Sequence, residues 1–203
     1  MAIQAPSRRR AIEDVASGLF RERGYAATSI RDIARALDIR GASVYAHVTS
    51  KEDMLWAIVE RAARAFEEGA DRALAECHCT DPSTRLAALT RAHVGVITAD
   101  PELASVFVHE WRHLSPGRRQ LILVRRDAYQ RRFRDLIDAG ITEGAFTTAD
   151  LALAATFILS ALNGIATWYR RTGRLDVDSI VDHFADYAVR SVGGRVSHQE
   201  TDR

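Results

Sequence analysis

Lysine is almost missing from this chain, and cysteine is scarce. The 203 residues contain one lysine, Lys51, and two cysteines, Cys77 and Cys79, which flank His78. A zinc site needs three or four protein ligands and usually a C-x2-C spacing, so this pair provides too few. We interpret the two cysteines as ordinary small residues at a helix end. We predict no catalytic residue, no metal and no cofactor.

An excess of charge of one sign is also lacking. The formal net charge is +1 at pH 7, so the charge balance by itself does not indicate nucleic-acid binding. The opening residues, MAIQAPSRRR, have no apolar core of the kind that a secretory signal contains. We therefore expect a soluble, cytoplasmic protein.

One uncharged stretch, residues 151–169, is long enough to cross a bilayer, which takes about 20 apolar residues. It is rich in alanine and also contains glycine, serine, threonine and asparagine. We interpret it as a helix buried on most sides within a bundle or a dimer. No membrane partner is expected.

Sustained alternation of polar and apolar residues is absent, whereas apolar residues recur at helical spacing along the whole chain. Thr28, Ser50 and Thr148 are the predicted N-caps of three helices. The predicted helices cover residues 8–23, 29–36, 40–46, 51–78, 83–98, 102–113, 117–139 and 149–171, with a last one from Asp176 or Asp178 to Val192. The expected fold is all-α, with about nine helices in two domains, 1–50 and 51–203.

Residues 29–46 combine a short helix, a tight turn and a second short helix, which is the plan of a DNA-binding helix-turn-helix. The second helix of such a unit lies in the major groove. Gly41, Ala42 and Ser43 are small enough to allow a close approach, and Arg40 can reach a guanine edge or the backbone. Lys51 begins the next helix, where the helix dipole already favours an anion.

The segment over residues 19–55, LFRERGYAATSIRDIARALDIRGASVYAHVTSKEDML, resembles the TetR family of bacterial transcriptional repressors. The positions that carry the resemblance are Phe20, Gly24, Tyr25, Thr28, Ile33, Ala34, Tyr45, His47, Ser50, Lys51 and Glu52. Two positions depart from it, because Asp38 stands where members often have glycine and Val48 where they often have phenylalanine. If the turn needs a positive φ, Asp38 must adopt it, and aspartate tolerates that conformation better than most residues.

The resemblance implies phosphate contacts around the second short helix. Tyr45 is expected to present its hydroxyl to a phosphate, with core packing as the alternative, and His47 either contacts phosphate or packs. Arg8–Arg10 forms either a solvated run or an arm that follows the phosphates. The predicted DNA-binding residues are Thr28, Ser29, Arg40, Gly41, Ala42, Ser43, Tyr45, His47 and Lys51.

The last two helices resemble the dimer-forming pair of the family, which implies a homodimer on double-stranded operator DNA. The alternative is that these residues form only the core of a single chain. The predicted dimer interface consists of Leu151, Ala155, Ile158, Phe184, Tyr187 and Ala188.

Two stretches, VFVHEWRHLSPGRR (106–119) and TWYRRTGRLD (167–176), place tryptophan beside arginine. With RDAYQRRF (126–133), they resemble the C-terminal domains of TetR regulators of fatty-acid and steroid breakdown, which respond to acyl-CoA. Such a ligand needs an apolar slot, an aromatic ring for adenine and guanidinium groups for phosphates. The predicted slot is Phe107, Trp111, Phe157, Ala161 and Leu162, and the predicted polar end is Trp168, Tyr169, Arg170, Arg171 and Arg174.

The predicted function is therefore that of a repressor released by a small hydrophobic effector, with an acyl-CoA as the specific candidate. Helix 51–78 is expected to transmit the effect of ligand binding, because it touches both domains. A regulator of an efflux or other metabolic operon with a non-CoA effector is the alternative. His109, Glu110 and His113 match the H-E-x-x-H pattern of zinc hydrolases, but no third ligand is indicated. An enzyme of this kind, and a helical interaction module without a DNA role, are the more distant alternatives.

Overall fold

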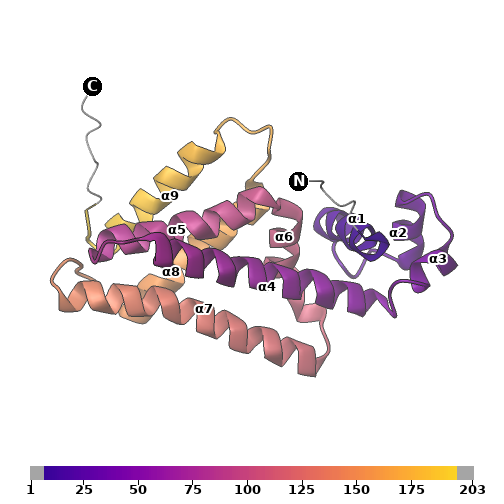
Figure 1. The fold of residues 1–203 in the computed structure, drawn as a ribbon, viewed down its shortest axis with the longest axis horizontal. Helices are drawn as coiled ribbons and strands as arrows, with labels where there is room; N and C mark the ends of the chain where they lie inside the picture. Colours follow the sequence, from indigo (N-terminus) through magenta and orange to yellow (C-terminus); the bar gives the residue numbers. More distant parts are fainter. Residues whose placement is uncertain (1–6, 196–203) are drawn as a thin grey trace. The chain divides into compact units, whose positions relative to one another are not determined.

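The structure is a computed structural model that describes residues 7–195, and the regular secondary structure in this range is helical (Figure 1). The predicted all-α fold is confirmed. The elements are α1 (Arg8–Arg23), α2 (Ile30–Ala36), α3 (Gly41–Tyr45), α4 (Lys51–Glu76), α5 (Pro82–Ala99), α6 (Pro101–His109), the short 3-10 helix η1 (Trp111–His113), α7 (Pro116–Thr142), α8 (Leu151–Trp168) and α9 (Val177–Ser191).

The chain forms two compact units, and the first contains the described residues up to Arg64 together with Asp100–Val124. Within it, α1 packs against α2 and α6, and α2 packs against α3. The apolar stripe predicted for residues 8–23 faces this core, because Ile12, Ala16 and Phe20 have no exposed surface.

The second unit contains Ala65–Ala99 and the described residues from Arg125 onward. Helix α5 packs along α9 and α8, and α8 also contacts α9. Its core includes the fully buried side chains of Leu86, Leu89, Ile97, Phe133 and Ile137. Helices α4 and α7 contribute residues to both units, and the domain boundary at residue 50 stays a prediction.

Two of the three predicted N-caps are wrong by one or two residues. Helix α2 is capped by Ser29 rather than Thr28, through a capping box in which Ser29 Oγ accepts from the Asp32 amide and the Asp32 carboxylate accepts from the Ser29 amide. Helix α8 is capped by Asp150 rather than Thr148. The Ser50 cap is confirmed by a 3.0 Å hydrogen bond from the Asp53 amide.

Two helix ends also differ from the prediction. Helix α6 ends at His109, and Trp111–His113 continues as a 3-10 helix. Helix α7 passes Gly140 and ends at Thr142, because the Gly140 carbonyl accepts from the amides of Ala145 and Phe146 in the following turn. Gly140 therefore lies inside the last turn of α7 and does not stop the helix.

Helix α8 is long and apolar enough to cross a membrane by length and composition, a test that core helices of soluble proteins also pass. Burial on most sides was predicted, but within one chain 28% of its 18-residue window is buried. Leu153 and Phe157 are 67% and 60% exposed. This chain alone therefore does not cover the apolar surface of α8.

Candidate functional site

The turn between α1 and α2, residues 24–29, is held by hydrogen bonds from side chains. Lys51 Nζ donates to the carbonyls of Tyr25 and Thr28, both at 2.8 Å. Thr28 is buried, and its hydroxyl donates to the Gly24 carbonyl at 2.9 Å. The predicted DNA-binding residues Thr28 and Lys51 therefore shape the turn that precedes the helix-turn-helix.

The turn between α2 and α3 has the conformation anticipated for it. Asp38 adopts φ 53°, which makes it the one non-glycine residue with a positive φ in the part of the chain that the structure describes. Glycine takes this conformation without steric cost, which explains the glycine that family members often have here, and aspartate is one of the few other residues that tolerate it. The turn leads to Arg40, the N-cap residue of α3.

Helix α3 places its polar and small residues on the surface. Val44 is buried, whereas Ala42, Ser43 and His47 are exposed. Tyr45 is 58% exposed, so the alternative that it serves only as core packing is wrong. The predicted groove-reading residues thus share a solvent-facing surface.

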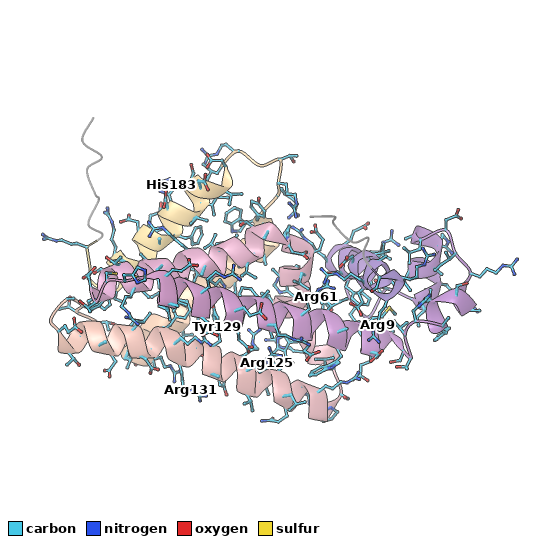
Figure 2. All side chains as sticks on the ribbon, viewed as in Figure 1. Arg9, Arg61, Arg125, Tyr129, Arg131 and His183 are labelled. Carbon is cyan, nitrogen blue, oxygen red and sulfur yellow. The ribbon has the colours of Figure 1, made fainter. Side chains whose placement is uncertain are left out.

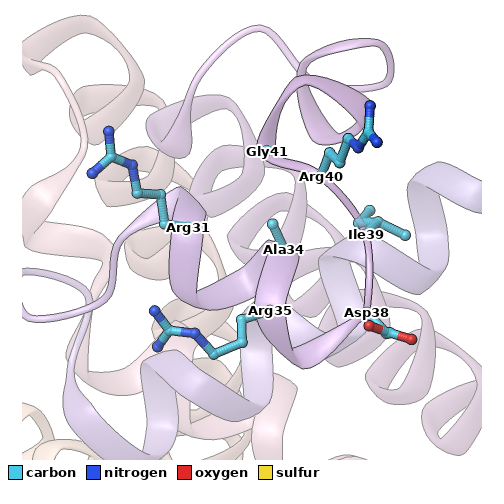
Figure 3. Close-up of a pocket in the computed structure, with 7 residues that line it drawn as sticks. All are labelled: Arg31, Ala34, Arg35, Asp38, Ile39, Arg40 and Gly41. Carbon is cyan, nitrogen blue, oxygen red and sulfur yellow. The ribbon is translucent and has the colours of Figure 1, made fainter.

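Two hollows flank this surface. One, of about 460 Å³, lies between α2 and α3 and is shown in Figure 3. It is lined by Arg31, Ala34, Arg35, Asp38, Ile39, Arg40 and Gly41. The other, of about 660 Å³, is lined by Ala26, Ala27, Thr28, Ser29, Ile30, Arg31, Tyr45, Thr49, Ser50 and Lys51.

Arg31 and Arg35 are candidate contacts that the sequence reasoning missed. Arg31 lines both hollows, and in Figure 3 the guanidinium groups of Arg31 and Arg35 extend from α2 in a common direction. Both residues are exposed and lie four positions apart, a spacing that places them on one face of a helix. That spacing was the signal available in the sequence.

The arginine run at the start of the described chain is part of α1. Arg9 donates to Glu13 at 2.9 Å and to Asp53 at 3.3 Å, and Arg10 donates to Asp14 at 3.0 Å. Arg61 of α4, labelled with Arg9 in Figure 2, also pairs with the two α1 carboxylates. Arg9 and Arg10 therefore pair with neighbouring carboxylates within a helix, and the alternatives of a solvated run and an arm that follows the phosphates both stay predictions.

The H-E-W-R-H stretch does not form the arrangement that the zinc alternative requires. That pattern needs both histidines one turn apart on a continuous α-helix. Here His109 ends α6 and His113 lies in η1, where its Nε2 is 3.5 Å from Glu110 Oε2. Within residues 7–195, no group of three or more His, Cys, Asp or Glu side chains is placed to hold a metal ion.

In the second unit, α8 and α9 enclose an apolar groove of about 290 Å³. It is lined by Phe157, Ile158, Ala161, Leu162, Phe184, Tyr187, Ala188, Arg190 and Ser191. Four residues of the predicted dimer interface therefore lie beside three residues of the predicted acyl slot. The other two interface residues, Leu151 and Ala155, lie elsewhere on α8, and Ala155 is fully buried.

A second groove of about 290 Å³ gathers most of the predicted polar end of a CoA site. It is lined by Trp168, Tyr169, Arg170, Gly173, Arg174, Leu175 and Ile180. Arg171 does not line it and instead donates to the Ala99 carbonyl at 2.7 Å. The remaining slot residues, Phe107 and Trp111, are buried in the first unit, and their part in a ligand site stays a prediction.

The sequence reasoning also missed a buried aromatic cluster in the second unit. His93 Nδ1 lies 3.1 Å from the Tyr129 hydroxyl, and the rings of Phe66 and Phe133 contact both residues. Burial, together with the charge of Arg126, lowers the pKa of His93 to about 3. Burial raises the pKa of Tyr129 above its ordinary range. This histidine is therefore neutral in the folded protein at physiological pH.

Two family models match the chain. Residues 12–58 match the bacterial regulatory proteins of the tetR family, and residues 79–192, more than half of the chain, match the tetracyclin repressor-like C-terminal domain. The first match covers the helix-turn-helix with its two hollows. The second covers the α8–α9 grooves.

Similar proteins share the architecture over most of their length. The HTH-type transcriptional repressor KstR2 of Rhodococcus jostii is 30% identical over an alignment of 184 residues that covers 87% of each chain. The structure of KstR2 of Mycobacterium tuberculosis superposes with a TM-score of 0.78 at 27% identity, covering 94% of this chain and 95% of that one. AibR, in complex with isovaleryl coenzyme A and operator DNA, also has a TM-score of 0.78 at 27% identity, covering 89% and 97%.

The helix-turn-helix at residues 30–45 and the helices that follow it in the sequence agree with these matches, which together cover most of the chain. The chain belongs to the TetR family of bacterial regulatory proteins.

Proposed function

We propose that this chain is a transcriptional repressor that binds operator DNA as a homodimer and is released by an acyl-CoA. The observation that carries the DNA-binding part is the surface of α2 and α3. There Arg31 and Arg40 line one hollow, Arg31 and Tyr45 line the other, and the small residues Ala42 and Ser43 of α3 are exposed. A surface of this kind can bind phosphates at its rim and approach base edges at its centre.

Arg40 is the proposed base-reading residue, and Arg31 the proposed phosphate-binding residue. A bidentate arginine–guanine pair contributes about 1–3 kcal/mol of discrimination, so Arg40→Ala should weaken operator binding by about ten- to a hundred-fold. Loss of one phosphate contact reduces the slope of log affinity against log salt by about one, which is the result expected for Arg31→Ala.

The experiment begins with a duplex selected by the wild-type chain from a random-sequence pool, and measures affinity by fluorescence anisotropy. Arg72→Ala, an exposed arginine of α4 in the second unit, removes the same charge and should leave affinity and salt slope near the wild-type values. If no duplex is enriched, or if Arg72→Ala and Arg40→Ala weaken binding equally, the proposed DNA-binding surface is wrong.

The acyl-CoA part of the proposal is supported by the groove at the end of α8. Trp168 is 49% exposed there and offers a face for adenine, while the exposed Arg170 and Arg174 lie beside it for phosphates. The neighbour AibR, which carries isovaleryl coenzyme A, shares the fold. The single chain therefore presents an aromatic ring and two cations in one groove, as a CoA end requires.

A thermal-shift panel tests the effector class. Acyl-CoAs, the matching free acids and CoA alone are compared, because a compound that binds only the folded state raises the melting temperature. We expect acyl-CoAs to stabilise the wild type, with a weaker shift in Arg174→Ala and an unchanged one in Arg72→Ala. Stabilisation by free acids alone would instead support the alternative of a non-CoA hydrophobic effector.

A further inference from the structure

The H-E-W-R-H stretch, residues 109–113, contacts the turn that precedes the helix-turn-helix. The backbone amide of Tyr25 donates to Glu110 Oε2 at 3.1 Å. The ring of His113 stacks on the Tyr25 ring, with centroids 5.3 Å apart and planes 27° apart. All of these residues belong to the first unit.

Groups from three segments surround the Tyr25 ring. The rings of Phe20 in α1 and Tyr25 pack edge to face, with their centroids 5.2 Å apart. Lys51 Nζ of α4 lies 4.2 Å from the centroid of the Tyr25 ring. The His113 ring of η1 stacks on the Tyr25 ring. Burial raises the pKa of the Tyr25 phenol, and the charge of Glu52 raises it further. This side chain is thus a fixed anchor for the turn.

The residue before Tyr25 explains why the turn needs support. Gly24 has φ 82° and ψ 154°, a conformation available essentially to glycine alone. Its carbonyl and those of Tyr25 and Thr28 are held by Thr28 Oγ1 and Lys51 Nζ, which leaves the Tyr25 amide to Glu110. The α6–α7 junction, residues 110–115, therefore supplies the acceptor for the Tyr25 amide.

The junction is itself tied to the start of α4. The Ser115 amide donates to Glu52 Oε1 at 3.0 Å, and Arg118 lies 3.5 Å from Glu52 and 3.4 Å from Asp53. The Ser115 hydrogen bond lowers the pKa of Glu52, so this carboxylate stays charged. The junction, the turn and the first turn of α4 thus form one connected set of contacts.

We propose that Glu110 and His113 are positioning residues that hold the Tyr25 turn, and with it the start of α2, in the conformation that reads DNA. The inference rests on the proposed operator binding. In this proposal Glu110 and His113 support α2 and α3 from the α6–α7 junction, and we call this pair of contacts to Tyr25 the brace. Movement of the junction would then be transmitted directly to α2 through Tyr25.

Two pairs of variants test the brace. Glu110→Ala removes the acceptor for the Tyr25 amide, whereas Glu110→Gln keeps an oxygen there. His113→Ala removes the stacked ring, whereas His113→Phe keeps a ring of similar shape. We expect the alanine variants to bind the selected duplex about tenfold more weakly, and the conservative variants to stay within about twofold of the wild type.

Hydrogen exchange at the Tyr25 amide separates the brace from the proposed function. Faster exchange in Glu110→Ala with tenfold weaker duplex binding supports the proposal. Faster exchange with unchanged binding overturns it, because the contact then exists without positioning the reading helices. If the wild type selects no duplex, operator binding fails while the exchange result still reports on the contact. If Glu110→Ala does not fold, the His113 pair provides the same comparison.

A separate observation concerns the two thiols between α4 and α5. Cys77 and Cys79 are both free and partly exposed, and their Sγ atoms lie 2.7 Å apart. Residues two positions apart in a chain are separated by at most about 7 Å, which is close to the upper limit of the Cα separation that a disulfide spans, so any less extended backbone brings the pair into range. Oxidation therefore needs only a small local movement.

We infer that this pair is a peroxide-sensitive modification site that closes to an intramolecular disulfide. One thiolate attacks a peroxide oxygen, which gives a sulfenic acid and hydroxide, and the hydroxide takes up a proton from solvent to become water. The second thiol then attacks the sulfenic sulfur, forms the disulfide and releases a second water. The peroxide is reduced by the two electrons that the thiols lose.

Thiol titration and mass spectrometry after hydrogen peroxide treatment test this inference. We expect the loss of both thiols, a monomer lighter by two hydrogens and full reversal by dithiothreitol. Cys77→Ser and Cys79→Ser should instead give sulfenic or sulfinic acid on the remaining cysteine. Accumulation of sulfinic acid or of cross-linked chains in the wild type would overturn the inference.

Discussion

Replacing Gly140 by alanine tests the packing of α7 most directly. A Cβ at this position would lie 2.1 Å from Phe146 Cδ2, 2.4 Å from Cε2 and 2.8 Å from Cγ. Phe146 cannot easily withdraw, because it is 2% exposed and its amide donates to the Gly140 carbonyl at 3.0 Å. The substitution therefore forces either the ring or the helix to move.

The magnitude follows from two opposing effects. Overpacking costs about 1–3 kcal/mol, and contacts this short place the cost at the upper end. Alanine regains at most about 1 kcal/mol of helix propensity over glycine. We expect a net loss of about 2 kcal/mol in the free energy of unfolding, or about 4–8 °C in melting temperature for a chain of this size.

Gly95 provides the matched control. It lies within α5 of the same unit, and a Cβ there would meet no atom within 4 Å. Gly95→Ala should therefore stabilise the protein by about 0.5–1 kcal/mol. Urea and thermal unfolding of both variants measure the difference. If Gly140→Ala is as stable as Gly95→Ala, the Phe146 ring yields freely and the packing argument is wrong.

Three further predictions concern the turn, the buried histidine and the apolar face. Asp38→Val should lose about 1–2 kcal/mol in urea unfolding, since a β-branched residue resists φ 53°, whereas Asp38→Asn should be neutral. His93 binds its proton with a pKa of about 3 when folded and about 6.5 when unfolded, so it makes stability fall as pH drops from about 6.5 toward 3. His93→Gln should flatten that slope in urea midpoints measured across the window, and an unchanged slope would contradict the assignment. Phe157→Glu should shift the chain to monomer in sedimentation, while Leu121→Glu, at a similarly exposed apolar side chain, should not.

The features that could be predicted from the sequence are those set by neighbours three or four residues away. The apolar stripe and Gly24 predicted α1 at residues 8–23, the bounds that the structure has. The Ser50 cap depends on one amide three residues on, and it is also confirmed. Thr28 and Ser29 are both good caps, and only the burial of Thr28 decided between them.

Other features were ambiguous because the same residues are compatible with two conformations or two kinds of contact. H-E-W-R-H reads as one helical turn with two histidines on one face, yet the α-helix ends within it. Phe157 fits an acyl slot and a dimer face equally well in the sequence, and its 60% exposure places it on the open side of α8. Helical spacing tells which residues share a face but not what that face meets.

The helical class, the approximate starts of most helices and the helix-turn-helix could be predicted from local sequence, because capping, turn conformation and apolar periodicity are local. The contacts of the single lysine, in contrast, depend on how distant segments pack. Lys51 was expected at a phosphate, but its ammonium group donates to two carbonyls more than twenty residues earlier and covers the Tyr25 ring. Glu110 reaches the same turn from 85 residues away. Such partners are chosen by packing across distant segments, and no local pattern in the chain records that choice.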